Sequence, residues 1–222
     1  MAKSLTSETS QSLAQIVHLI EACRICRDAP SGVQLPHEPR PVVRVSATAR
    51  LLIAGQAPGV RVHASGRPFT DPSGDRLRQW LGIGHDEFYD QSSVAIVPMG
   101  FCFPGHDARK ADLPPRPECR AAWHDKLMQA LPQVESIFVI GKYAQDYHFG
   151  RAGFDRYRKR PVTEIVRQWR EFANASPRLF PLPHPSWRNS GWLKKNPWFE
   201  AEVLPAIRAE TARLLRPALA CG

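Results

Sequence analysis

The sequence lacks several features that would place it in well-known protein classes. It contains no run of 18 or more apolar residues and no basic-then-apolar segment at its start, so we expect neither a membrane span nor a secretory signal. No Gly-Lys-Ser/Thr ending follows a glycine-rich loop, which argues against a phosphate-cradling loop. Internal repeats and low-complexity blocks are also absent. These absences predict a cytoplasmic globular protein with no membrane partner.

Cysteine is scarce, with five in 222 residues. In a reducing compartment such thiols are free or bind metal rather than forming disulfides. Cys23 and Cys26 form a C-x2-C pair, Cys102 and Cys119 have sixteen residues between them, and Cys221 is left over. Four thiolates in two pairs suit a four-iron four-sulfur (4Fe-4S) cluster or a tetrahedral zinc ion. Four buried free thiols are the alternative interpretation.

Charge and length point to one domain with a polyanionic partner. Lys and Arg number 30 against 21 Asp and Glu, which gives a net charge of +9 and a pI near 9.7. Such a balance suits nucleic acid, although solubility alone also explains it. The chain is long enough for one substantial core. We therefore expect a flexible N-terminus over residues 1–12 and a single domain over residues 13–222.

Buried strands alternate with helices along the chain. Short apolar runs predict strands over residues 50–54, 94–99, 136–140 and 179–182. Helical spacing predicts helices over residues 13–22, 75–81, 118–131, 143–149, 162–172 and 198–215, the second capped by Ser73 or Asp75. This alternation predicts an α/β fold, a three-layer αβα sandwich with a central, mostly parallel, four-stranded sheet.

The stretch from Leu51 to Asp75 is the most informative part of the sequence. The apolar run Leu51–Ala54 ends abruptly in Gly-Gln-Ala-Pro-Gly, residues 55–59, which predicts a strand that enters a loop needing glycine freedom and a fixed proline φ. Ligands of α/β proteins bind outside the carboxyl ends of parallel strands. We therefore expect this loop, with Phe69 and Asp71 after it, to line a pocket, although a tight connection would look similar.

A second informative segment follows the fourth predicted strand. His184 lies between two prolines, a restricted backbone that suits a hydrogen-bond donor with a fixed position. Cations and aromatic residues follow it densely. This combination can hold phosphates and stack on bases or insert between them. The candidate DNA-binding residues are Trp187, Arg188, Asn189, Lys194 and Lys195, whereas Trp198 and Phe199 are expected to pack the last helix.

Taken together, these motifs resemble those of the uracil-DNA glycosylase superfamily. The resemblance lies in GQAPG, in GRPFTDPSGD over residues 66–75, in the tripeptide HPS over residues 184–186, and in the four-cysteine pattern. It covers residues 23 to 215 and is greatest to the iron-sulfur bacterial and archaeal branches. It implies a four-stranded parallel sheet between helices, a 4Fe-4S cluster, and hydrolysis of uracil from DNA in base excision repair.

The resemblance also assigns roles to individual residues. Gln56 would contact the flipped base and position water, Asp71 would activate or orient that water, and His184 would stabilise charge on the departing base. The base would stack on Phe69. Other substrate-binding candidates are Ala57, Pro58, Gly59, His63 and Ser186, and the implied cluster ligands are Cys23, Cys26, Cys102 and Cys119. His63 can equally be an ordinary polar loop residue.

Some positions depart from the family pattern. Ala57 lies where the most efficient branch has a catalytic aspartate, and Gln56 replaces a glutamate usual in the iron-sulfur branch. Pro98 and Met99 lie where relatives often have an asparagine that reads uracil. The expected partner is therefore DNA containing uracil or another deaminated base, bound by a monomer. A non-catalytic DNA-damage binding protein, a hypoxanthine or xanthine glycosylase and a zinc protein are the alternatives.

Overall fold

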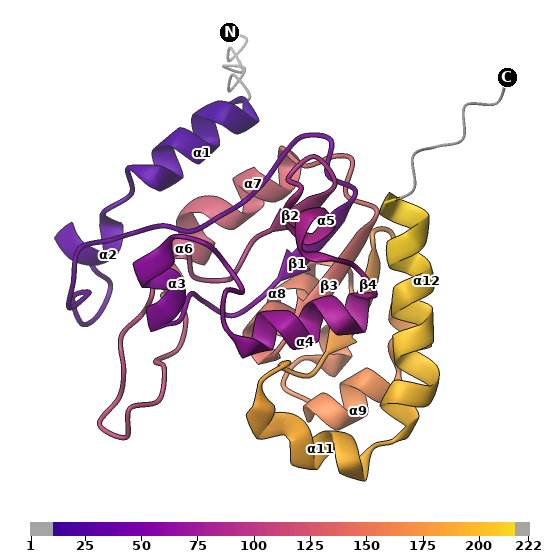
Figure 1. Cartoon of the computed structure of the whole chain (residues 1–222). Helices are drawn as coiled ribbons and strands as arrows, with labels where there is room; N and C mark the ends of the chain where they lie inside the picture. Colours follow the sequence, from indigo (N-terminus) through magenta and orange to yellow (C-terminus); the bar gives the residue numbers. More distant parts are fainter. Residues whose placement is uncertain (1–10, 216–222) are drawn as a thin grey trace, which may run out of the picture.

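A parallel four-stranded sheet forms the centre of the computed structural model, which describes residues 11–215 (Figure 1). The strands lie in the order β2-β1-β3-β4, and every neighbouring pair is parallel. Their bounds are β1 Leu51–Ala54, β2 Val94–Ile96, β3 Ser136–Ile140 and β4 Arg178–Leu182. The predicted fold class is confirmed.

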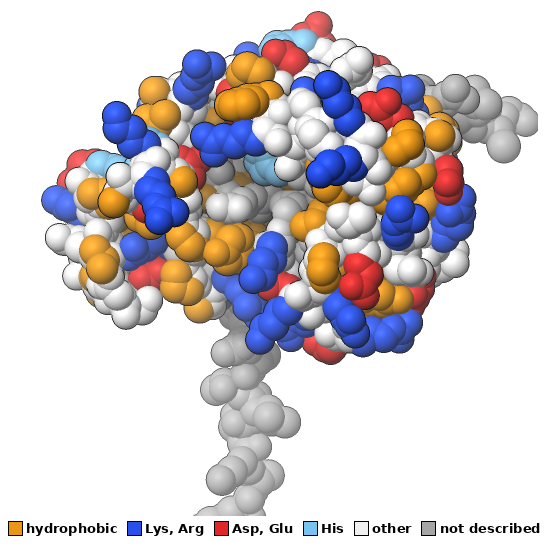
Figure 2. Space-filling view, turned by 90° about the horizontal axis from the view of Figure 1, so that it is seen from below, with side chains coloured by type: hydrophobic (Ala, Val, Ile, Leu, Met, Phe, Trp, Pro, Cys, Tyr) orange, Lys and Arg blue, Asp and Glu red, His pale blue; other side chains and the backbone are white. Residues whose placement is uncertain are grey.

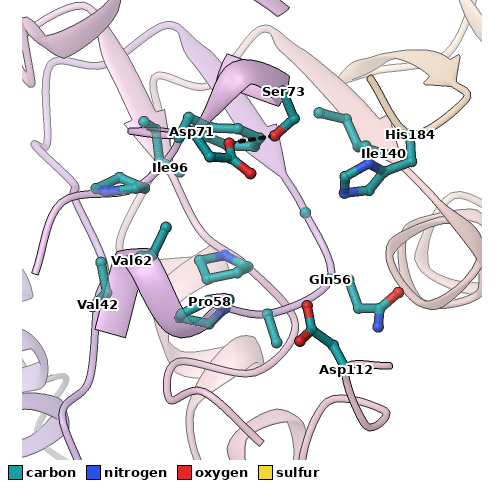
Figure 3. Close-up of a pocket in the computed structure, with 16 residues that line it drawn as sticks. Val42, Gln56, Pro58, Val62, Asp71, Ser73, Ile96, Asp112, Ile140 and His184 are labelled. Carbon is teal, nitrogen blue, oxygen red and sulfur yellow. Dashed lines mark hydrogen bonds between the residues drawn. The ribbon is translucent and has the colours of Figure 1, made fainter. Parts of the chain in front are cut away.

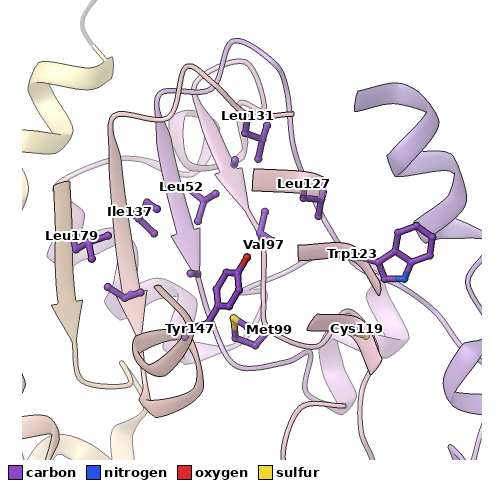
Figure 4. Packing of buried hydrophobic residues seen from close by; sticks show 14 of the residues in the cluster. Leu52, Val97, Met99, Cys119, Trp123, Leu127, Leu131, Ile137, Tyr147 and Leu179 are labelled. Carbon is purple, nitrogen blue, oxygen red and sulfur yellow. The ribbon is translucent and has the colours of Figure 1, made fainter. Parts of the chain in front are cut away.

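Both faces of the sheet are buried, which explains why the strands are continuous apolar runs. Successive residues of a strand point to opposite faces. Leu52 and Ile137 accordingly enter one hydrophobic cluster, while Ile53 and Phe138 enter the other. Figure 4 shows the first cluster, in which strand residues face the ring of Tyr147 and the side chains of the α6–α7 region.

Helices cover each face of the sheet. Residues of α1 Leu13–Glu21, of α7 Asp125–Gln129 and of α8 Lys142–Arg151 pack in the first cluster. Residues of α4 Pro72–Leu81, α5 His85–Tyr89 and α12 Leu204–Leu215 pack in the second. The remaining helices are α2 Ile25–Asp28, α3 Val60–Ser65, α6 Pro117–Cys119, α9 Val162–Arg167, α10 Trp169–Phe172 and α11 Ser190–Lys195. π-helical turns at Arg120–His124 and Phe199–Val203 continue into α7 and α12.

Several element boundaries differ from the sequence prediction. α4 begins at Pro72 rather than at residue 75, because Asp71 caps it and proline suits the first helical position. β2 ends at Ile96 rather than at residue 99, although the Val97 and Met99 N–H groups still donate to the Ile53 and Gly55 carbonyl oxygens of the neighbouring segment. Four short helices, α2, α3, α5 and α11, were not predicted, because four to six residues are too few to show a helical period.

The order in which the chain adds strands to the sheet reverses between β1 and β3. β1 connects to β2 on one side of it, whereas β3, on the other side, connects onward to β4. Ligand crevices of α/β sheets form at such a switch point, outside the carboxyl ends of the strands. The loops that leave β1, β2, β3 and β4 meet there.

Ten residues of the predicted flexible N-terminus, 1–10, and Cys221 lie outside the described residues. Within the described part, Ser12 caps α1 through a reciprocal pair of hydrogen bonds with Gln15. No helix among residues 11–215 has the length and apolar character needed to cross a membrane.

Candidate active site

An inner pocket of about 120 Å³ opens at the switch point of the sheet (Figure 3). Its deep wall is apolar and includes Val42, Val62, Ile96, Pro98 and Ile140. Seven of the predicted site residues line it, namely Gln56, Ala57, Pro58, Gly59, Phe69, Asp71 and His184. The loop after β1 and the segment after β4, about 130 residues apart in the chain, thus form one cavity.

Phe69 is held in an unusual backbone conformation at the pocket wall. Its φ of 55° is left-handed, a region that side-chain-bearing residues rarely adopt. The Tyr89 hydroxyl donates to its carbonyl oxygen at 3.1 Å. That oxygen also lies so close to Gly74 that a Cβ built there would be 1.9 Å away. Gly74 is therefore required for the placement of the Phe69 ring.

Asp71 has two tasks at the start of α4. Its Oδ1 atom accepts from the Ser73 hydroxyl at 2.6 Å and from the Gly74 N–H at 3.4 Å, so the side chain caps the helix. The same carboxylate also lines the inner pocket. Capping fixes its orientation and leaves its second oxygen without a hydrogen bond from the described residues.

His184 presents one defined ring nitrogen to the pocket. The Ser186 N–H donates to its Nδ1 atom at 3.2 Å, which requires Nδ1 to be unprotonated and leaves the proton on Nε2. Desolvation by the surrounding wall lowers the pKa of His184, while the charges of Asp71 and Asp112 act in the opposite direction. The Asn189 amide donates to the His184 carbonyl oxygen at 2.7 Å and fixes the backbone. A neutral imidazole that donates through Nε2 is the result.

Asp112 is a pocket residue that sequence reasoning missed. It comes from the proline-rich loop after β2 and lies beside Gln56, across the cavity from Asp71 (Figure 3). Its Oδ1 atom is 3.1 Å from Nε2 of His106. No local pattern in the sequence marks it, because an aspartate in an irregular loop looks like any solvated residue.

An outer groove of about 580 Å³ leads to the inner pocket. One wall is the segment from Ala111 to Leu113, and the other runs from Ser186 to Asn189. Trp187 has 71% of its surface exposed, and the Arg188 guanidinium lies 5.9 Å from its ring centre. Figure 2 shows the face with this hollow, with Lys and Arg side chains around it.

The other predicted DNA-binding residues lie on or beside α11. Lys194 and Lys195 are exposed in its last turn and line neither cavity. Asn189 lines the outer groove, but its amide nitrogen is engaged by the His184 carbonyl oxygen. Trp198 and Phe199 pack into the second hydrophobic cluster with Trp192, as the sequence predicts.

His63 lies away from both cavities. Its ring packs against His37, with centroids 4.3 Å apart, and against Phe103 at 6.1 Å. Burial lowers the pKa of His63, and its Nδ1 atom is buried without a hydrogen-bond partner among the described residues. The helix α3, which the sequence did not predict, turns this side chain away from the pocket.

Two cysteine pairs distant in sequence lie in one region. The neighbouring Cys119 thiol lowers the pKa of Cys26 to about 7, and burial raises the pKa of Cys102 to about 12. Trp123 Nε1 donates to the Cys23 sulfur at 3.4 Å. These soft donors suit iron or zinc in chemistry. As arranged, however, no three His, Cys, Asp or Glu side chains among residues 11–215 are close enough together to hold a metal ion.

Comparison with known families agrees with the site geometry. A family model described as the uracil DNA glycosylase superfamily matches residues 43–208. The match includes the loop after β1, the Phe69 and Asp71 segment, Asp112 and His184, whereas Cys23 and Cys26 precede it. The match spans most of the chain and all four strands of the sheet. This chain therefore belongs to the uracil DNA glycosylase superfamily.

Proposed function

We propose that this protein is a monofunctional DNA glycosylase that hydrolyses the N-glycosidic bond of uracil in DNA, as a step of base excision repair. The observation that carries the proposal is the His184 ring, whose Nδ1 atom is occupied by the Ser186 N–H and whose Nε2 atom is free to donate. The Phe69 ring and the Asp71 carboxylate line the same cavity. A stacking surface, a donor and a negative charge are the groups that this bond cleavage needs.

The outer groove supports DNA as the partner. A base inside a duplex cannot be reached, so the nucleotide must first be extruded into the pocket. The exposed Trp187 ring can fill the space that the base leaves, and Arg188 can hold a neighbouring phosphate. Lys194 and Lys195 extend the positive surface along α11. The net charge of +9 favours the same partner.

The chemistry follows from charge development at the two ends of the breaking bond. The C–N bond breaks with both electrons leaving on the base, and the sugar becomes cation-like. His184 donates a hydrogen bond to the base oxygen as negative charge grows there, a contribution of about 3 kcal/mol for one oriented donor. The Asp71 carboxylate, which lines the same cavity, supplies negative charge to the cation-like sugar. Water then adds to the sugar and the base takes up a proton.

Base selectivity depends on the groups that meet the far edge of the base in the pocket. The deep wall includes Ile96, Pro98 and Ile140, so the far edge of the base meets apolar side chains there. The Gln56 side chain and the backbone groups of the loop after β1 can then bind the polar atoms of the base. Because Pro98 of this wall lies where relatives often have an asparagine that reads uracil, excision of hypoxanthine or xanthine is a second candidate activity, which a panel of oligonucleotides with modified bases would compare with uracil.

Cys23, Cys26, Cys102 and Cys119 are the proposed ligands of a 4Fe-4S cluster, with zinc as the alternative metal. The proposal is supported by four soft donors brought to one region from two distant segments. A bound cluster would tie the N-terminal segment to the loop after β2. Iron, sulfide and zinc analysis of anaerobically purified protein, with its visible absorbance, distinguishes the two metals from free thiols.

The activity is tested by alkali-revealed cleavage of a labelled single-stranded oligonucleotide with one uracil. We expect wild type to release the base, His184→Ala to be about 100-fold slower and Asp71→Asn to be slowed at least as much. Release by both variants at the wild-type rate would contradict the assigned roles. Specific binding to damaged DNA without release of any base in the panel would instead identify a non-catalytic damage-binding protein.

A further inference from the structure

The loop from Gly105 to Pro114 has an internal pairing that positions the Asp112 side chain at the pocket. Its two arms are joined by a hydrogen bond from the Leu113 N–H to the Gly105 carbonyl oxygen at 2.9 Å. His106 and Asp112 face each other across an antiparallel bridge between these arms. This pairing fixes the position of Asp112 in the pocket wall.

The loop after β1 leaves room for this carboxylate. A Cβ built on Gly59 would lie 3.6 Å from Oδ2 of Asp112, so a larger side chain at residue 59 would occupy the space next to it. Ala57, beside it in the same loop, is also small and lines both cavities. Asp112 itself lines the inner pocket and the outer groove, where the two meet.

The carboxylates of Asp71 and Asp112 differ in the hydrogen bonds that their oxygen atoms already accept. Oδ1 of Asp71 is taken up by the Ser73 hydroxyl and the Gly74 N–H of the helix cap. Asp112 is paired through Oδ1 with His106 alone among the described residues, and its side chain is 52% exposed. Its Oδ2 atom is therefore available to a water molecule at the pocket mouth.

We infer that Asp112 orients and deprotonates the water that attacks the sugar, and that His106 positions its carboxylate. This inference rests on the proposed glycosylase function. The water oxygen forms the new bond to the sugar carbon from which the base departs with the bonding electrons. One water proton passes to Asp112 Oδ2, which then releases it to solvent and returns to the carboxylate form. The departing base takes up one proton from solvent, so the products are the neutral base and the sugar hydroxyl. Asp71 then serves to cap α4 and to place charge beside the sugar.

The position of Asp112 in the outer groove gives it a second property. A DNA strand lying between the Ala111–Leu113 wall and the Ser186–Asn189 wall would cover the carboxylate. Covering removes bulk water from its surroundings and strengthens its interaction with the one water that remains. The Asp112 carboxylate, which is exposed to solvent in the free protein, would thus be shielded from bulk water only when DNA is bound.

The inference is tested by single-turnover excision with Asp112→Asn. We expect a rate about 100-fold below wild type, within the range for loss of a general base, with oligonucleotide affinity and unfolding midpoint unchanged. Asp107→Asn is the matched control, since it makes the same charge change at the tip of the same loop and keeps an acceptor for the Arg109 and Ala111 N–H groups. It should excise at the wild-type rate.

His106 is tested by its pattern of rescue. His106→Ala should slow excision about tenfold without changing oligonucleotide affinity, and His106→Gln, which keeps an N–H donor, should recover most of the rate. An Asp112→Asn rate within threefold of wild type would overturn the inference while leaving the glycosylase function intact. Wild type that releases no base from any oligonucleotide of the panel would overturn both.

Discussion

The two ends of the sheet each have a cavity with a histidine in its wall, and only one end has the features of a site. At the carboxyl end, His184 lines the inner pocket. At the amino end, beside the starts of β3 and β4, His148 lines a cavity of about 320 Å³ together with Leu131, Ile137 and Leu179. Desolvation lowers the pKa of both histidines, although His148 is buried and His184 is exposed at the pocket.

The charges around His184 and His148 differ in sign, and the hydrogen bonds of the two rings differ as well. His184 is opposed by the carboxylates of Asp71 and Asp112, and a backbone N–H fixes which ring nitrogen carries the proton. His148 is only 3% exposed, its Nε2 atom has no partner among the described residues, and the nearby charges are those of His124 and Arg151. Burial, with these like charges, lowers the pKa of His148 to about 3.

This contrast shows what makes a cavity chemically useful. A desolvated histidine alone is a neutral packing residue. It becomes a candidate catalytic group when its tautomer is set and when charges of the opposite sign face the same space. Substitutions at the two ends of the sheet should therefore have different effects.

The largest effect is expected at the glycine that shapes the carboxyl end. Gly74→Ala would place a Cβ 1.9 Å from the Phe69 carbonyl oxygen, so the pocket wall or α4 must move. We expect a loss of at least about 3 kcal/mol in the free energy of unfolding, together with loss of excision. Denaturant unfolding and the excision assay measure the two effects.

Gly191→Ala is the control for Gly74→Ala. Gly191 lies in α11, and a Cβ built there meets no heavy atom within 4 Å among residues 11–215, apart from its chain neighbours and the backbone of its own helix. Its substitution should leave unfolding unchanged or stabilise the helix by about 1 kcal/mol. Equal stability of the two variants would show that the close contact at Gly74 does not support Phe69.

A smaller effect is expected at the amino end, and it concerns stability rather than rate. The pKa of His148 is about 3 in the folded chain against 6.5 in the reference state, so the unfolded chain binds a proton first as pH falls. The stability that neutral His148 provides is complete above pH 6.5 and is lost below it, by about 1.4 kcal/mol per pH unit down to pH 3.

His148→Leu removes this dependence. Between pH 7 and pH 5 the free energy of unfolding should fall by about 2 kcal/mol less than in wild type, as measured by denaturant titration at each pH. Excision at pH 7.5 should match wild type, in contrast to His184→Ala. A large loss of excision in a stably folded His148→Leu protein would refute the distinction between the two ends.

The smallest effect is expected in the outer groove. Arg188→Ala should weaken oligonucleotide binding by a similar factor for every sequence and reduce the salt dependence of log K by about one counterion. Arg170→Ala, on α10 and paired with Glu202, is the matched control that should change neither. A salt slope unchanged by Arg188→Ala would exclude a phosphate contact there.

Much of the fold could be predicted from local pattern. Runs such as Leu51–Ala54 and Ser136–Ile140 are strands because both faces of a parallel sheet are buried, and the structure confirms all four. The loop after β1 and the HPS segment were recognisable because glycine, proline and histidine at strand ends restrict the backbone in known ways. Their shared cavity follows from the parallel order of the strands.

Other features depended on contacts between distant segments. The left-handed Phe69 is set by Gly74 and Tyr89, and the direction of His63 by its packing on His37 and Phe103. Neither follows from the residues next to it in sequence. The same is true of the capping role of Asp71, which the sequence alone assigned to Ser73 or Asp75.

The sequence by itself determined the strands, the parallel sheet and the motifs from which the family was recognised, because these depend on burial period and on backbone restrictions of single residue types. Only the tertiary structure decided that Asp112, 41 residues after Asp71, completes the pocket wall. The position of Asp112 depends on the pairing of the loop's arms and on the free space beside Gly59. Neither can be inferred from the residues next to Asp112 in the sequence.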